Sequence, residues 1–164
     1  MHNENEVLTQ EQQFETKLSI LADILSKKRD ALLAVLAISE NQESLYASPP
    51  SPERRDFLVA MGKQKQEHID TVLTADEVFQ GIFESVSYIF QDKGTQYAKQ
   101  VRYLQAAIKD VLEIDVKIRA QEEKTKVAAQ TAWGQPTKTD PINPANTNYI
   151  LEQYKNNNRT RPKG

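Results

Sequence analysis

The 164-residue chain contains no cysteine, which excludes disulfides, thiolate zinc sites and catalysis by a thiol. It has only five glycines and no glycine-rich loop of the kind that cradles phosphates. Its two histidines lie far apart, and it lacks the Glu-x-x-His pairs of a di-metal carboxylate bundle. We therefore expect no catalytic residues, no metal site and no cofactor.

The chain also lacks any long hydrophobic run. No stretch approaches the ~18–20 apolar residues that span a bilayer, and the polar N-terminus does not resemble a secretory signal. The net charge of -2 gives no electrostatic reason for a nucleic-acid partner. Together with the absence of cysteine, these features predict a cytoplasmic protein without membrane insertion.

What the chain has instead is helical periodicity, which runs from about Leu8 to Trp133. A first helix is predicted to begin near Thr9, with Gln12 as its capping-box partner, and to end by Ser48 before a run of prolines. Its apolar stripe is broad, which predicts contact with two neighbouring helices. The narrower part of that stripe is Phe14, Leu18, Leu21, Leu25, Leu32, Val35 and Leu36.

Two further helices follow. The segment Ser51-Pro52-Glu53 supplies a cap, a first-turn proline and an acid at the positive end of the helix dipole. The second helix is expected to run for roughly 40 residues, or ~60 Å, and to end at Asp92-Lys93-Gly94. The third begins near Tyr97, so the two are predicted to form an antiparallel hairpin. Beyond Lys117 the third helix is highly charged, and we expect its end to project from the bundle or to pair with another molecule.

The composition changes after residue 134. Four prolines and many Asn and Thr residues leave too little apolar area to offset the cost of ordering the backbone. We therefore predict an all-α fold: an elongated antiparallel bundle of three long helices, a helical hairpin plus an N-terminal helix, over residues 1–134. Residues 135–164 are predicted to be a disordered C-terminal tail. This tail carries one short apolar motif, formed by Tyr149, Ile150, Leu151 and Tyr154.

Two residues have open interpretations. Trp133 lies where the third helix ends, and it is interpreted equally as an anchor for a partner protein or as a side chain that folds back to cap the bundle. His68 could be phosphorylated on a helical bundle, but the lysine and glycine that usually follow such a histidine are Thr71 and Val72 here. A histidine at a helix interface is the simpler interpretation.

Two segments resemble the FlgN-type flagellar export chaperones of Gram-positive bacteria. They are 68-HIDTVLTADEVFQGIFESV-86 and 97-YAKQVRYLQAAIKDVLEIDVKIRAQEEKTK-126. The sequence departs from the family pattern at Ala75, Val78 and Thr125. The residues that fit the pattern are Asp76, Glu77, Phe79, Ile82, Phe83, Val86, Tyr97, Leu104, Gln105, Ile108, Ile118, Glu122 and Lys126.

The resemblance implies an enzymatically inert, cytoplasmic chaperone that works with a type III export apparatus. Its clients would be flagellar hook-associated proteins of the hook–filament junction, whose C-terminal helices it would hold to prevent premature assembly. By position only, the client-binding residues would be Ile118, Trp133, Tyr149, Ile150, Leu151 and Tyr154. The alternative is a structural coiled-coil scaffold that self-associates through its helices, for example as a homodimer. A histidine phosphotransfer module acting through His68 ranks third.

Overall fold

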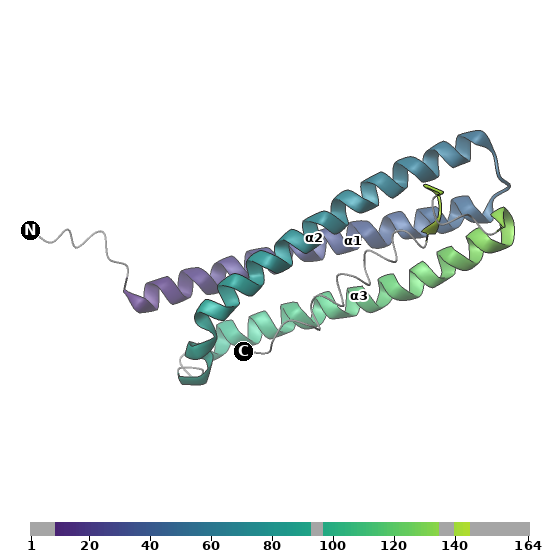
Figure 1. Ribbon diagram of the computed structural model, residues 1–164. Helices are drawn as coiled ribbons and strands as arrows, with labels where there is room; N and C mark the ends of the chain where they lie inside the picture. Colours follow the sequence, from purple (N-terminus) through teal and green to yellow (C-terminus); the bar gives the residue numbers. More distant parts are fainter. Residues whose placement is uncertain (1–8, 93–96, 135–139, 145–164) are drawn as a thin grey trace, which may run out of the picture.

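The computed structural model describes residues 9–92, 97–134 and 140–144. They form three long helices: α1 (Gln10–Ala47), α2 (Pro52–Asp92) and α3 (Ala98–Trp133). Figure 1 shows the helices side by side in an elongated rod, with α2 antiparallel to both α1 and α3. The predicted all-α bundle of three long helices is confirmed.

Local sequence signals set the helix ends where they were predicted. The Thr9 hydroxyl accepts the backbone N–H of Gln12 at 3.2 Å, and the Gln12 side chain accepts the N–H of Thr9 at 3.1 Å, so α1 starts with a capping box. Pro52 is the first residue of α2, and the Ser51 hydroxyl accepts an N–H of its first turn. α3 ends at Trp133 and is followed by Gly134, whose φ of +74° favours glycine.

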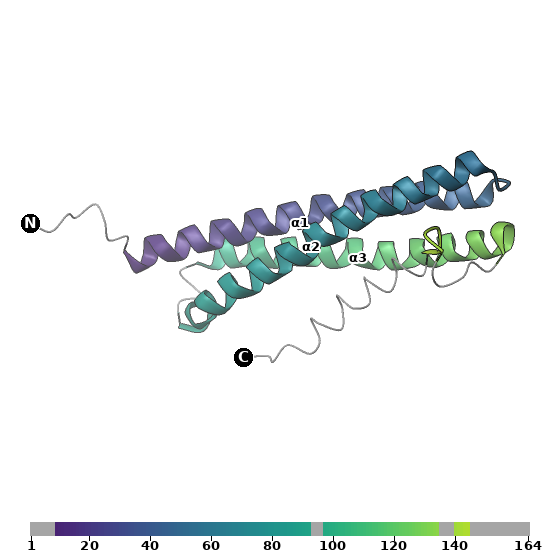
Figure 2. The same ribbon diagram turned by 45° about the horizontal axis from the view of Figure 1, so that its top comes forward.

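The helix α1 is the shared partner of the other two. It packs along its length against both α2 and α3, whereas the backbones of α2 and α3 hardly approach each other. The broad apolar stripe of α1 therefore contacts two neighbours, as predicted. The second and third helices run antiparallel, as predicted for the hairpin (Figure 2), and the backbone of each packs mainly against α1.

Two apolar clusters fill the rod, and a band of buried polar residues separates them. The main cluster runs from Phe14 to Val35 on α1 and includes Ile69 to Val86 of α2 and Tyr97 to Ile118 of α3. The smaller one, called the end cluster here, contains Tyr46, Leu58, Ala129 and Ile142, with Trp133 packed against it. The buried residues between them, called the polar layer, are Ser39, Gln42, Lys65, Gln121, Glu122 and Thr125.

Candidate protein-binding surfaces

An aliphatic stripe on α3 faces solvent. Its members Ile108, Leu112 and Val116 have exposed fractions of 36 %, 59 % and 63 %. Since they are four residues apart, they follow one flank of the helix over ~12 Å at 1.5 Å per residue. Single exposed aliphatic residues are ordinary, but three in line form a patch that a second helix can cover. We call these three residues the α3 stripe.

Two open grooves flank α1. The groove between α1 and α3, of about 510 Å³, is lined by Leu18, Ala22, Tyr103 and Leu104 together with polar side chains. Tyr103 is 66 % exposed, so most of its ring is available to a partner. The groove between α1 and α2, of about 460 Å³, has Val78 as its exposed aliphatic residue. The rod thus offers apolar surface on more than one side.

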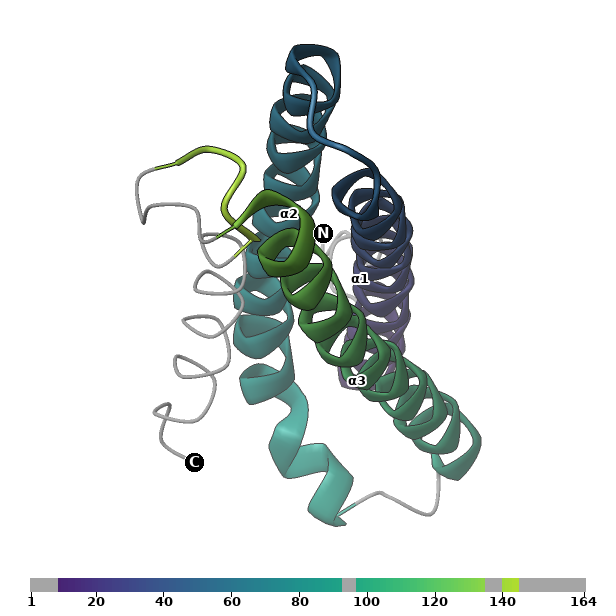
Figure 3. The same cartoon turned by 90° about the vertical axis from the view of Figure 1, so that its right-hand side faces the viewer.

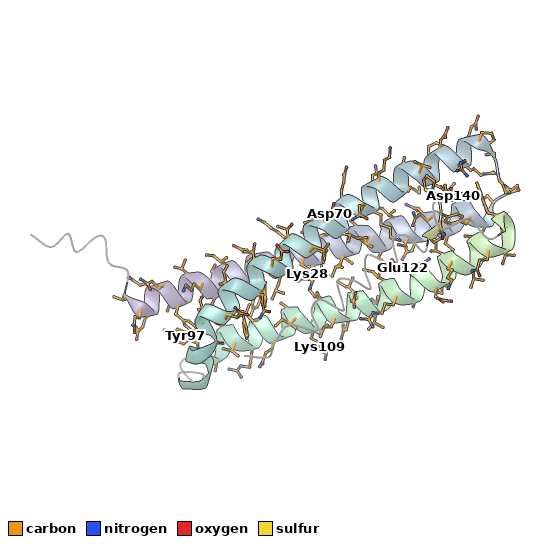
Figure 4. The ribbon with its side chains drawn as sticks, viewed as in Figure 1. Lys28, Asp70, Tyr97, Lys109, Glu122 and Asp140 are labelled. Carbon is orange, nitrogen blue, oxygen red and sulfur yellow. The ribbon has the colours of Figure 1, made fainter. Side chains whose placement is uncertain are left out.

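The polar layer is held by contacts among all three helices. Lys65 Nζ of α2 lies 3.4 Å from Glu122 Oε1 of α3, with side-chain exposures of only 2 % and 7 %. Lys65 Nζ also donates to Gln42 Oε1 of α1 at 3.3 Å. Burial lowers the pKa of the Lys65 ammonium, and the charge of Glu122 opposes that shift. Figure 4 places Glu122 along the rod between the levels of Lys28 and Asp140.

The charged end of α3 does not project from the bundle, so that alternative is wrong, whereas its pairing with another molecule stays a prediction. Gln121, Thr125 and Ala129 are buried, and Gln121 Nε2 donates to Glu43 Oε2 of α1 at 2.5 Å. Thr125 Oγ1 lies 3.1 Å from the carbonyl oxygen of Ser39. The polar residues of α3 can be buried here because α1 has hydrogen-bonding groups at the same level along the rod.

Ile118, assigned to client binding by position in the family pattern, is completely buried in the main cluster. In this arrangement its side chain has no surface to offer, so the assignment of Ile118 as a direct client contact is corrected. Its position places it among the core residues of α3, one turn beyond Ile114, which is also buried. A client could reach Ile118 only if the helices separated.

Trp133 folds back onto the bundle, the second of its two interpretations. Its indole Nε1–H donates to the carbonyl oxygen of Tyr46 at 3.0 Å, and the two rings meet edge to face with centroids 6.0 Å apart. Trp133 therefore closes the end of the rod where α3 finishes. It is only partly buried, so part of its side chain remains accessible.

Residues 140–144 of the tail are docked on the bundle, which corrects the expectation of disorder for this short segment. Ile142 is 5 % exposed within the end cluster. The Tyr46 hydroxyl donates to the Ile142 carbonyl oxygen, and Arg55 Nη2 lies 3.0 Å from Asp140 Oδ1. Burial, followed by the charge of Asp140, raises the pKa of Tyr46. Figure 3 shows this segment beside α2 and α3, on the side away from α1.

The sequence did contain a signal for this docked segment. Asp-Pro-Ile-Asn-Pro is a turn sequence, because proline favours the second position of a β-turn and aspartate the first. In the structure Asp140 Oδ1 accepts the N–H of Ile142 at 3.2 Å, and the Asp140 carbonyl accepts the N–H of Asn143 at 3.0 Å. What the turn packs against could not be predicted from the sequence alone.

The remaining predicted client-binding residues, Tyr149, Ile150, Leu151 and Tyr154, lie outside the described residues, and their role stays a prediction. His68 is half-buried on α2. Within residues 9–92, 97–134 and 140–144, no group of three His, Asp or Glu side chains could hold a metal ion. Among these same residues, no helix combines the length and apolar character needed to cross a membrane.

Comparisons with protein-family models, with curated proteins and with solved structures found no match. Function is therefore inferred from the surfaces of this chain and from the resemblance of the two segments on α2 and α3. The α3 stripe and the end cluster, which share no residue, are the two candidate binding sites.

Proposed function

We propose that this protein is a non-enzymatic chaperone that covers helices of a client protein, of the FlgN-type flagellar export class. Its clients would be hook-associated proteins of the hook–filament junction, held through their C-terminal helices until type III export. The observation that carries the proposal is the α3 stripe, a line of exposed aliphatic side chains on a long rigid helix. The two segments that resemble the family supply much of α2 and most of α3.

The stripe suits a helical client. A helix presents side chains every three or four residues along one face, and the spacing of Ile108, Leu112 and Val116 matches that interval. A client helix that assembles with other copies of the client through an apolar face would expose that face in the cell if nothing covered it. Binding it to α3 removes the apolar area of both helices from water.

The free energy that a client gains by covering the stripe indicates whether the stripe alone can be the binding surface. Covering the exposed parts of its three side chains is worth about 2–5 kcal/mol, because full burial of one such side chain is worth about 1.5–3 kcal/mol. A micromolar complex requires ~8 kcal/mol after the cost of association. The client must therefore contact more than the stripe.

The proposal is tested by titrating the C-terminal helical segment of a hook-associated protein into the full chain by calorimetry. Leu112→Asp places a charge in the stripe and is expected to weaken binding at least tenfold. Ala106→Asp is the matched control, because Ala106 is exposed on the same helix ~120° away around its axis. Equal effects of the two substitutions, or no binding by the unaltered chain, would contradict the proposal.

The same exposed stripe would serve self-association in a structural scaffold. Light scattering over a range of concentrations separates the two functions. A chaperone of this kind is expected to be monomeric when free and to lose no helicity on dilution. If Leu112→Asp instead converted a stable homo-oligomer into monomers, the stripe would be an interface between copies and the scaffold would be the better account.

A further inference from the structure

In the end cluster a segment of the same chain packs against all three helices, and the site that it covers is called the pocket here. Ile142 packs there among Tyr46 of α1, Leu58 of α2 and Ala129 of α3. Each helix contributes one wall, so the pocket forms only when the three helices are assembled. No part of it belongs to the α3 stripe.

The pocket recognises three chemical features of its occupant. Its apolar walls take the aliphatic side chain of Ile142, which is 5 % exposed. The Tyr46 hydroxyl donates to the Ile142 carbonyl oxygen, and Arg55 pairs with the Asp140 carboxylate at 3.0 Å. Because the pKa of Tyr46 is raised, its hydroxyl keeps the proton that it donates throughout the neutral range. A site with a shaped apolar pocket, a donor and a cation is built to select one kind of segment.

The occupant is pre-organised and tethered. Two hydrogen bonds close on Asp140, and Pro141 fixes one backbone dihedral, so the turn loses little entropy on docking. Its polar contacts with the bundle include the tyrosine hydrogen bond and an ion pair whose arginine is 46 % exposed. An ion pair as exposed as this one adds little. The turn is also tethered next to the pocket, which gives it a high effective concentration.

We propose that this pocket is a docking site for a partner polypeptide that carries an aspartate–proline turn with an aliphatic residue two positions after the aspartate. Residues 140–144 occupy the site until such a partner displaces them. The tethered turn competes with any partner for the pocket. A partner can therefore bind only if it presents all three features. Because the site shares no residue with the α3 stripe, its assignment does not depend on the proposed client-binding function.

Trp133 reports on this site directly, since it is the only tryptophan of the chain and packs against the end cluster. The probe is a synthetic peptide of residues 138–146, titrated into the full chain and followed by tryptophan fluorescence. Ile142→Asp removes the tethered competitor, and this variant is expected to bind the peptide at least tenfold more tightly than the unaltered chain. Adding Arg55→Ala to that variant is expected to weaken peptide binding at least threefold.

Two glycines of α2 provide a matched control. A Cβ at Gly62 would lie 4.0 Å from the carbonyl oxygen of Pro141, in ordinary contact, so a longer side chain there would extend toward the turn and compete with it for space. A Cβ at Gly81 would meet nothing within 4 Å. In the Ile142→Asp background, Gly62→Gln is expected to abolish peptide binding, whereas Gly81→Gln is expected to leave it unchanged.

A second measurement needs no peptide and no change in the tail. In the otherwise unaltered chain, Gly62→Gln is expected to increase acrylamide quenching of Trp133, and Gly81→Gln is not. The proposal is overturned if Ile142→Asp fails to bind the peptide, if the two glycine variants behave alike, or if the unaltered chain forms a dimer that Ile142→Asp dissolves. In the last case the turn would dock on a second copy rather than on its own bundle.

Discussion

The buried pair Lys65–Glu122 gives the sharpest prediction for stability. At 3.4 Å and an effective dielectric constant of ~20, the attraction between the two charges is about 5 kcal/mol. Removing both charges from water costs several kcal/mol per ion, so the pair as a whole is expected to add little. Lys65→Met alone leaves the carboxylate of Glu122, 7 % exposed, without its lysine and is expected to cost about 3–5 kcal/mol. The double variant Lys65→Met, Glu122→Met is expected to be as stable as the unaltered chain or more so.

The assay is urea unfolding followed by far-UV circular dichroism, with the free energy obtained by linear extrapolation. The half-exposed pair Arg29–Asp110, which joins α1 to α3 at 2.5 Å, is the control. There the single variants Arg29→Met and Asp110→Asn are expected to cost less than about 1 kcal/mol each, because solvent screens the pair. A double variant of the buried pair that is as unstable as the sum of its single variants would refute the reasoning, since it would mean that the two charges do not compensate each other.

Three further outcomes follow from particular contacts. Ser39 is completely buried and its hydroxyl has no hydrogen-bond partner among the described residues, so Ser39→Ala is expected to raise the unfolding free energy by about 1 kcal/mol in the same assay. Leu21 is completely buried in the main cluster, so Leu21→Ala should lower the unfolding free energy by about 2–5 kcal/mol; a smaller loss would mean a loosely packed core. The raised pKa of Tyr46 implies stability that is fully present below pH ~10 and lost as the pH rises further, and Tyr46→Phe should remove this part of the alkaline loss.

The helix boundaries could be predicted from the sequence because they depend on local chemistry. Thr9 with Gln12, and Ser51 with Pro52, act within one helical turn, and these signals determine where a helix begins wherever it lies. The contact of α1 with two neighbours was also predictable, since the width of an apolar stripe is a property of one helix.

The polar layer and the docked turn could not be predicted in the same way. Gln121 and Glu122 have the residue types of a solvated helix face, and their burial depends on Glu43 and Lys65, which are far away in the sequence. The packing of Ile142 likewise depends on three helices that meet only in the folded bundle. Long-range partners of this kind leave no periodicity in the chain. Ile118 is a different case: it was assigned to client binding by its position in the family pattern, although it lies four residues after the buried Ile114, on the core side of the helix.

Site-specific photo-crosslinking tests the central claim most directly. A photoreactive residue is placed at position 112 within the α3 stripe, or at position 106 on the other flank of α3, in the full chain. After irradiation with a hook-associated protein, position 112 is predicted to crosslink to the C-terminal helices of that client, and position 106 to yield little product. Equal crosslinking from both positions, or crosslinks from position 112 only to a second copy of the chain, would contradict the account.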